Sequence, residues 1–167
     1  MVRKNMERAR NKFRNQKGFS LIELLIVVAI IGIISALAVP SLTAAKRAAN
    51  EGSAMASLRL IHSCEHGYRA ATGNIDFGTL TQLRAEFLTD GVLGSGTKSG
   101  YNFEVHPTTG VNPAQFYITA VPTNPSGVGQ TGTRRFAMAE DGVIKADTTL
   151  TVPADRAEVD GMPTLKN

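Results

Sequence analysis

The sequence contains a single cysteine, Cys64, so no intramolecular disulfide can form. Any folded domain must therefore be held together by packing or by contacts with neighbouring molecules. The sequence also lacks the common catalytic patterns. No spacing supports a Ser/His/Asp or Cys/His nucleophilic set, a pair of catalytic carboxylates or a phosphate-binding glycine loop. We therefore predict that the protein is not an enzyme and needs no cofactor.

Formal charge is absent from residues 24–45, a run of 22 residues. A helix rises ~1.5 Å per residue, so this run is long enough to cross the core of a bilayer. The preceding segment, residues 1–18, carries seven Lys/Arg and one Glu, which favours retention of the N-terminus in the cytoplasm. Residues 19–167 contain 11 Lys/Arg and 13 Asp/Glu, so the net charge of +4 gives no support for nucleic-acid binding.

One carboxylate, Glu23, stands at the start of this apolar run. An acid deep in a membrane costs about 2.5–3.5 kcal/mol, so one that is kept there usually has a partner. A simpler interpretation is an interfacial carboxylate that reaches toward the lipid headgroups. Gly32 and Pro40 lie within the run, where a membrane helix can tolerate both residues. Proline removes a backbone donor, so we expect a bend or local melting at residues 36–40.

Residues 17–42 closely resemble the class III signal of the type IV pilin family, which includes the pseudopilins of type II secretion. The resemblance rests on the cleavage and methylation motif Gly18-Phe19-Ser20-Leu21-Ile22-Glu23-Leu24, followed by Gly32 and Pro40. It implies that a membrane aspartyl peptidase cleaves between Gly18 and Phe19 and then methylates the new Phe19 amine. It also implies that Glu23 attracts the N-terminal amine of a neighbouring subunit.

The resemblance further implies a structural subunit of a type IV pilus-like filament, polymerised through its N-terminal helix. Such a precursor crosses the inner membrane once, in contact with lipid, before it is assembled at the cell surface. Its partners would be identical or homologous pilin subunits, the prepilin peptidase/N-methyltransferase and an inner-membrane assembly machinery with an ATPase.

Three alternatives remain open. A type II secretion pseudopilin shares this N-terminus and forms a short periplasmic piston. Major pseudopilins often bind calcium through an acidic C-terminal loop, for which Asp155, Glu158 and Asp160 are the candidates here. A binding module released by ordinary signal peptidase would be cut at the A-x-A pattern that ends at Ala38 and would begin at Val39. The third alternative is a membrane-anchored enzyme, for which the sequence contains no recognisable set of catalytic residues.

The cluster His62-Ser63-Cys64-Glu65-His66 has the composition of a metal site. On a helix, His62 and His66 share one side and Cys64 lies about 200° away, so only two imidazoles converge. We therefore expect two exposed histidines and one buried cysteine, without a metal. Arg134 and Arg135 are expected to begin a strand in contact with solvent.

The predicted fold class is α+β, with a long N-terminal helix packed on a small antiparallel sheet. We divide the chain into a leader (1–18), the membrane and polymerisation half of the helix (19–45), its amphipathic half (46–73) and a globular head (74–167) with a mobile loop at 122–133. The helix should end near Thr72, before Gly73. Its second half should pack on the head through a stripe of Gly52, Ala56, Leu60, Cys64 and Tyr68, with Met55 and Ala71 alongside.

A second helix is expected at residues 79–89, because Thr79 and Gln82 have the spacing of a capping box. Strands are expected at residues 101–105, 116–121, 134–139 and 143–146. The last two should be joined by a tight turn at Asp141-Gly142. The aromatic side chains expected in the core are Tyr68, Tyr101, Phe103, Phe116, Tyr117 and Phe136. The tail after Asp147 is left without regular structure.

Overall fold

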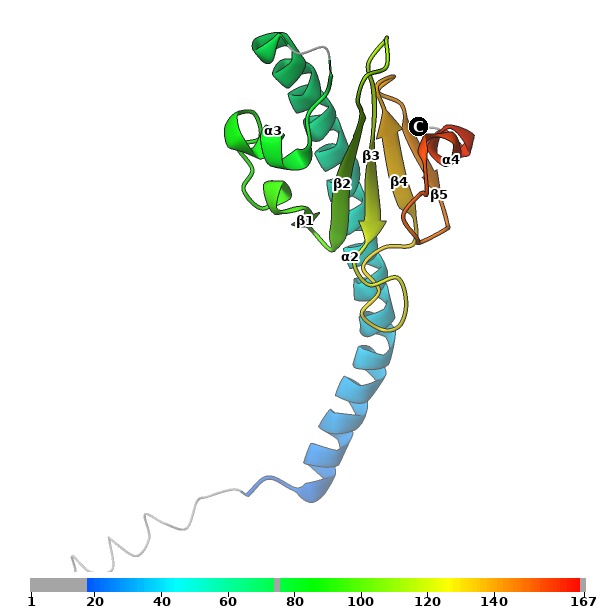
Figure 1. The fold of residues 1–167 in the computed structure, drawn as a ribbon. Coiled ribbons are helices and arrows are strands. Elements are labelled where there is room, and N and C mark those ends of the chain that lie inside the picture. Colours follow the sequence, from blue (N-terminus) through cyan, green and yellow to red (C-terminus); the bar gives the residue numbers. More distant parts are fainter. Residues whose placement is uncertain (1–17, 74–75, 166–167) are drawn as a thin grey trace, which may run out of the picture. The chain divides into compact units, whose positions relative to one another are not determined.

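The protein is described here by a computed structural model that covers residues 18–73 and 76–165 (Figure 1). Helix α2 (Leu21–Thr72) is followed by α3 (Leu80–Glu86), the 3-10 helix η1 (Leu93–Ser95), five strands and α4 (Arg156–Gly161). The strands are β1 (Thr97–Lys98), β2 (Tyr101–Thr108), β3 (Gln115–Pro122), β4 (Arg135–Ala139) and β5 (Ile144–Asp147). These elements confirm the predicted α+β class, a long helix with an antiparallel sheet.

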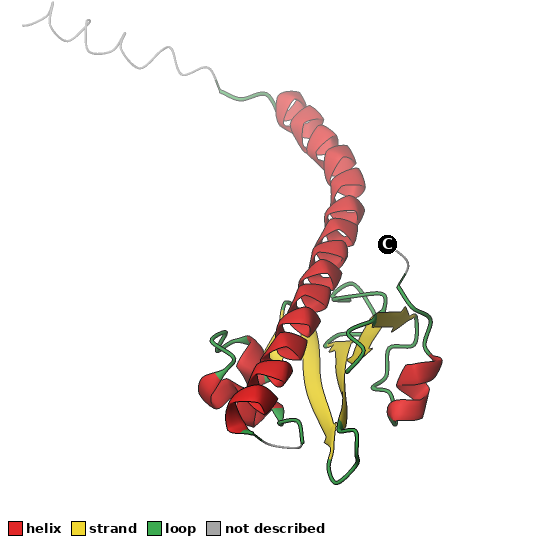
Figure 2. Cartoon of the chain, turned by 90° about the horizontal axis from the view of Figure 1, so that it is seen from above, coloured by secondary structure: helices red, strands yellow, loops and turns green. Residues whose placement is uncertain are grey.

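Two compact units divide the chain within α2, Met1–Leu42 and Thr43–Asn167. In the second unit the five strands form one antiparallel sheet in the order β1-β2-β3-β4-β5. Figure 2 shows residues 43–72 of α2 lying across one face of this sheet. Helix α4 contacts the opposite face, where Val159 and Met162 pack on Ala137 of β4.

The core lies between α2 and the sheet, and the strands supply alternate side chains to it. Phe136 and Met138 of β4 face α2, whereas Ala137 between them faces α4. The strand register aligns the inward-facing residues of neighbouring strands into continuous rows. The fully buried members with the largest side chains are Leu58, Ile61, Leu83, Leu93, Tyr101, Phe116, Ile118, Phe136 and Met138.

The predicted packing stripe on α2 is wrong in most of its members. Gly52, Ala56 and Ala71 are exposed, as is Leu60, with 41% of its surface accessible. The buried side of the helix consists of Glu51, Ala54, Ser57, Leu58, Ile61, Cys64 and Glu65. Residues four apart drift by about 40° around a helix at each step, whereas alternating steps of three and four stay on one side. Of the predicted stripe, Cys64 is buried, and Met55 and Tyr68 pack at its margin.

The ends of the first two helices follow the predicted local signals. Gly73, directly after α2, has a φ of +64°, a conformation that glycine adopts without strain. The Thr79 hydroxyl accepts the Gln82 N–H and the Gln82 side chain accepts the Thr79 N–H, which completes a capping box. Helix α3 is shorter than the predicted 79–89, because Phe87 already serves as its C-cap.

The four predicted strands are present with slightly shifted ends, and the tight turn at Asp141-Gly142 joins β4 to β5. Gly142 has a φ of +71°, and its N–H donates to the Ala139 carbonyl at 3.0 Å. The tail after Asp147, by contrast, is not irregular throughout. It forms α4 and then pairs with β5, where Leu165 N–H donates to the Ile144 carbonyl at 2.9 Å.

The orientation of α2 is tested by two neighbouring aliphatic residues. We expect Ile61→Ala to lower the free energy of unfolding by about 2–5 kcal/mol, because Ile61 is fully buried and its loss leaves a cavity. Leu60→Ala should cost less than about 1 kcal/mol, since that side chain is exposed. Denaturant unfolding of the full chain in detergent micelles measures both. Equal losses for the two variants would support the stripe expected from the sequence.

Candidate functional site: the N-terminal junction and apolar helix

The predicted cleavage site lies in non-helical chain directly before α2. Gly18, Phe19 and Ser20 have no regular secondary structure, and all three are exposed. The Phe19 side chain is 77% accessible, and a Cβ added at Gly18 would meet no atom within 4 Å. The bond between Gly18 and Phe19 is therefore open to a peptidase. The rest of the predicted leader, residues 1–17, lies outside the described residues.

Glu23 caps the helix on which it stands. Its Oε2 accepts the backbone N–H of Ser20 at 2.9 Å, and the Ser20 carbonyl accepts the Leu24 N–H at 3.2 Å. This contact is one half of a capping box. The sequence reasoning missed it, although the Ser-x-x-Glu spacing of Ser20 and Glu23 is the signal for it. The carboxylate is thus positioned at the first turn of α2, beside the Phe19 backbone.

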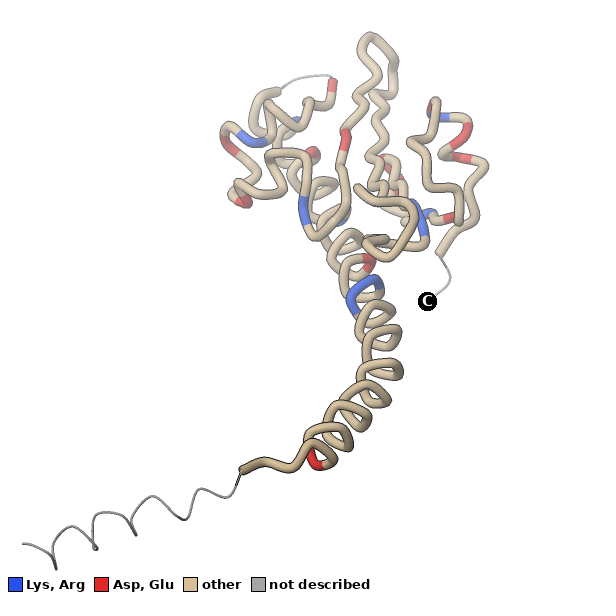
Figure 3. Tube along the Cα trace, turned by 90° about the horizontal axis from the view of Figure 1, so that it is seen from below, with Lys and Arg blue, Asp and Glu red and all other residues tan. Residues whose placement is uncertain are grey.

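Residues 21–42 of α2 form an apolar surface on every side. All these side chains are exposed, including Leu21 at 87% and Leu37 at 75%. By length and composition α2 is able to cross a membrane. Figure 3 shows the uncharged stretch that follows Glu23. Both Gly32 and Pro40 lie in continuous α-helix, so the local melting expected at residues 36–40 is not seen in this chain. The bend stays a prediction.

The comparisons with known proteins point to the same junction. The family described as having a prokaryotic N-terminal methylation motif matches residues 13–39. The chain carries this motif. It is also similar to the type IV wide pilus major component PilA4 of Thermus thermophilus, with 60% identity over 38 residues. That match covers 23% of this chain and 29% of the relative. No solved structure matches the chain.

With this motif and a long helix packed on an antiparallel sheet, the chain is type IV pilin-like. The matched part spans less than a third of the length of the relative, so the likeness concerns the N-terminus. The head, by contrast, has to be understood from its own contacts. Three polar networks within residues 43–165 hold it together.

The first network fixes the C-terminal segment to the sheet and corrects the expectation for Arg135. This side chain is 3% exposed, not solvated, and donates to both carboxylate oxygens of Asp147 at 2.8 and 2.9 Å. It also donates to Glu158 at 2.6 Å and to the Thr151 carbonyl at 2.9 Å. Burial disfavours the charged Asp147, but the hydrogen bonds from Arg135 outweigh it and lower the pKa of Asp147.

The three acids considered for calcium belong to this C-terminal network. The Asp155 side chain caps α4 by accepting the Glu158 N–H at 2.9 Å. Glu158 pairs with Arg135, and Asp160 pairs with Lys145 and Arg156, both at 3.0 Å. Because these carboxylates are already neutralised or capping, the calcium hypothesis loses its support. No group of three metal-ligating side chains occurs within residues 18–73 and 76–165.

The second network ties the end of the 122–133 loop to α2. Glu51 is 6% exposed and accepts hydrogen bonds from the N–H and hydroxyl of Thr133 at 2.8 and 2.7 Å. Arg134 adds a bidentate pair to Glu51 Oε2 at 3.0 and 2.8 Å. Asn50 donates to the Thr131 carbonyl at 2.8 Å. Near the middle of the loop, Val128 is 93% exposed. At the other end of the loop, the Thr123 N–H donates to the Gly100 carbonyl at 2.9 Å. Both ends are therefore anchored, and the mobility of the loop stays a prediction.

The third network centres on a buried carboxyl group, that of Glu65, which is hydrogen-bonded through only one of its two oxygens. Glu65 on α2 is fully buried, and its Oε2 accepts the Gly78 N–H at 2.9 Å. Its Oε1 has no hydrogen-bond partner in the described part of the chain. Burial, which disfavours the charged form, raises the pKa of Glu65 to about 7, although the bond from Gly78 opposes the shift. This burial could not be predicted, because Glu65 stands among polar neighbours in the sequence.

The other members of the 62–66 cluster separate as predicted, with one difference. Cys64 is buried and its thiol donates to the Phe87 carbonyl at 3.3 Å, away from the histidines. His66 is exposed, but His62 is half-buried against Phe116. Burial, with the nearby charges of His62 and Arg69, lowers the pKa of His66, so its neutral form is favoured.

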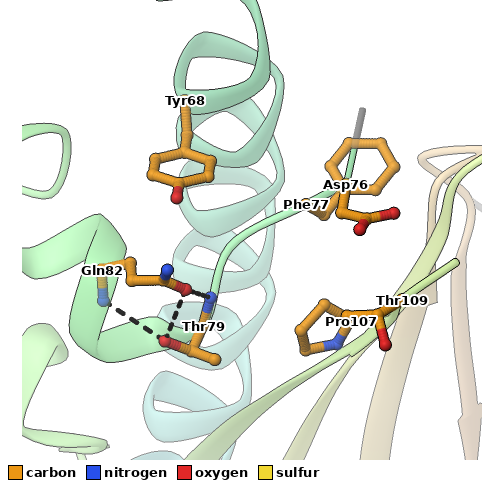
Figure 4. A pocket seen from close by; sticks show the side chains of 7 residues that line it. All are labelled: Tyr68, Asp76, Phe77, Thr79, Gln82, Pro107 and Thr109. Atoms are coloured by element: carbon orange, nitrogen blue, oxygen red, sulfur yellow. Dashed lines mark hydrogen bonds between the residues drawn. The ribbon is translucent and has the colours of Figure 1, made fainter. Parts of the chain in front are cut away.

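A recess of about 300 Å³ opens beside α3. It is lined by Tyr68, Asp76, Phe77, Thr79, Gln82, Pro107 and Thr109 (Figure 4). Thr79 and Gln82 are engaged in their capping box, and Asp76 accepts the Gly110 N–H at 3.4 Å. These polar groups serve the local structure, so we assign no ligand to the recess.

The Arg135 network predicts a local loss of structure when its cation is removed. Arg135→Gln leaves Asp147 and Glu158 without a charged partner, so the free energy of unfolding should fall by about 1–3 kcal/mol. The loss is smaller than for a fully buried pair because both acids are partly exposed. Amide exchange should quicken in residues 148–165. Lys98→Gln, which breaks the half-exposed pair with Asp90, is the control and should cost less than about 1 kcal/mol. Equal effects would contradict a special role for Arg135.

The buried Glu65 predicts a stability that falls as pH rises. Its pKa is about 7 in the folded chain and near 4.5 ordinarily, so the folded state retains the proton between these values. The retained proton stabilises the folded state. This stabilisation is complete below pH 4.5 and is lost as pH rises through 7. The shift corresponds to roughly 3 kcal/mol.

Glu65→Gln tests this, because glutamine can accept the Gly78 N–H but cannot ionise. As pH rises from 5 to 8, the free energy of unfolding of the variant should increase relative to that of the wild type by on the order of 3 kcal/mol. Denaturant unfolding in chelator-treated buffer measures the difference, and the exposed Glu86→Gln is the control. A constant difference across this pH range would show that Glu65 ionises normally.

Proposed function

We propose that this protein is a structural subunit of a type IV pilus-like filament. The observation that carries the proposal is the junction at Gly18–Phe19, followed at once by a helix whose residues 24–42 are uncharged, largely apolar and exposed on every side. A soluble protein does not leave such a surface uncovered. Before assembly, membrane lipid would cover it, and afterwards the helices of neighbouring subunits.

The first step is maturation. A prepilin peptidase would cleave after Gly18, and methylation would follow on the Phe19 amine. The accessible, non-helical chain at residues 18–20 supports this step. So does the N-terminal methylation motif that matches residues 13–39.

The second step is alignment in the filament. Removal of the leader leaves an amine at Phe19, four residues before Glu23. In an apolar surrounding each charge alone is unfavourable, so the Glu23 carboxylate of one subunit would attract the Phe19 amine of the next. Because residues 24–45 carry no charge, this pair would set the axial register.

Transfer from lipid to the filament gains little from the hydrophobic effect, since the lipid already covers the helix. An assembly machinery with an ATPase would therefore supply the work. The likeness to a wide-pilus major component favours a pilus over a secretion pseudopilus. The engagement of Asp155, Glu158 and Asp160 in capping and ion pairs also removes the calcium feature that favoured a pseudopilin.

The proposal is tested by two changes at Glu23. Glu23→Val removes both the charge and the cap, whereas Glu23→Gln keeps an acceptor for the Ser20 N–H and removes only the charge. We expect both variants to be cleaved to Phe19 but to form at least about tenfold fewer filaments, because the amine loses its partner. Mass spectrometry of the N-terminus and electron microscopy of sheared filaments measure the two steps.

The exposed head variant Glu86→Gln serves as the control and should assemble normally. Normal filaments from Glu23→Gln would mean that the cap, not the charge, is required. Normal filaments from Glu23→Val would refute the alignment step. A natural product that begins at Val39, or that is never cleaved, would refute the proposed function as a whole.

A further inference from the structure

Two imidazoles meet at the surface of the head without an assigned role. His62 and His66 stand one turn apart on α2, and their Nε2 atoms lie 3.3 Å from each other. Their ring centroids are 4.6 Å apart and the ring planes are inclined at 65°. The contact joins two groups of the same kind, so at most one of the nitrogens donates and the other accepts.

The separation suits a shared metal ion as well as a hydrogen bond. It lies beyond the usual range of roughly 2.7–3.2 Å for a hydrogen bond from N–H. In a tetrahedral zinc site with bonds of 2.0–2.1 Å, two nitrogen ligands stand about 3.3–3.4 Å apart. The two side chains therefore already have the spacing of neighbouring ligands, and no rearrangement of the helix is needed.

A third donor approaches from the turn between β4 and β5. The Glu140 carbonyl oxygen lies 3.3 Å from His62 Nε2. The same turn contains Gly142, where an added Cβ would stand 3.5 Å from His62 Nε2, at van der Waals contact, so the turn lies directly against the imidazole. Asp141, between them, is exposed. A nitrogen donor from α2 and an oxygen donor from the β4–β5 turn thus each lie 3.3 Å from His62 Nε2.

We propose that His62 and His66 bind a divalent transition-metal ion through their Nε2 atoms, with Zn²⁺ as the representative ion. The Glu140 carbonyl and water would complete the coordination. Imidazole favours Zn²⁺, Cu²⁺ and Ni²⁺ over hard ions such as Mg²⁺ and Ca²⁺. The bound ion would link α2 to the β4–β5 turn, and so act as a reversible cross-link in a head whose single cysteine excludes a disulfide.

The charges around the two histidines affect how tightly the site would bind a metal ion. The Arg69 guanidinium lies 5.1 Å from the Phe77 ring centroid, and that ring contacts His66, so a positive charge stands near the bound ion. The Glu140 carboxylate is occupied by Arg156 at 2.6 and 2.9 Å and offers little compensation. With two imidazoles and an adverse charge, the site should bind more weakly than a closed structural zinc site.

The experiment is a calorimetric titration of the full chain with ZnCl₂ at pH 7.5, in detergent and without a polyhistidine tag. We expect one Zn²⁺ per chain and no heat with MgCl₂. His66→Gln and His62→Gln should each weaken binding at least about tenfold, because only one imidazole remains. His66 is exposed, so its variant should fold normally, and circular dichroism checks this.

The third histidine of the chain supplies the matched control. His106 lies on β2 and stacks on Tyr117, away from this site, and His106→Gln should bind Zn²⁺ as the wild type does. Arg69→Gln should bind it more tightly, since the adverse charge is gone. Zinc should also slow amide exchange in residues 141–143 of the wild type but not of His66→Gln. Unchanged affinity in His66→Gln, or equal loss in His106→Gln, would overturn the proposal.

Discussion

The side of α2 that carries Ala54, Leu58 and Ile61 must remain buried against the sheet. Inward-facing side chains of strands β2 to β5 share one core with this side of the helix, and Leu83 of α3 and Leu93 of η1 add to it. The same helix leaves residues 21–42 exposed on all sides. One continuous helix is thus exposed on every side in its first part and buried on one side from Glu51 onward, and Lys46 and Arg47 lie between the two parts.

Without a disulfide, the parts of the head farthest from α2 depend on charge. Helix α4 has six residues, of which Val159 is buried against the outer face of the sheet together with the C-cap Met162. So small an apolar contact stabilises a short helix weakly. The buried Arg135 and Lys145 add ion pairs to Glu158 and Asp160 of the same helix. These cations are costly to bury, and each is matched by an acid that α4 brings to it.

Local signals in the sequence were sufficient for the end of α2, the start of α3, the turn between β4 and β5, and four of the five strands. Thr79 and Gln82 form the predicted capping box, and Asp141-Gly142 forms the predicted turn, because each depends on residues only a few places apart. The N-terminal methylation motif is also contiguous and was found in the same way, whereas the roles of Gly18, Phe19 and Glu23 stay predictions.

Features that depend on distant partners could not be predicted. Whether Leu60 or Ile61 is buried depends on where the sheet lies, and the two residues are equally apolar in the sequence. Arg135 was expected in solvent because its partners Asp147 and Glu158 lie 12 and 23 residues away. Helix α4 was missed because six residues with one buried side chain, Val159, show no helical periodicity, although Asp155 and Glu158 have the spacing of a cap.

The cap at Glu23 bears on how a filament could be aligned. A carboxylate has two oxygens and about four lone-pair positions, so the bond from Ser20 N–H to Oε2 leaves Oε1 able to accept a second donor. The cap and a contact to a neighbouring amine are therefore compatible. A side chain already held at the first turn loses less rotamer entropy when it binds that amine than a free one does. The intrachain hydrogen bond would thus favour the proposed contact between subunits rather than compete with it.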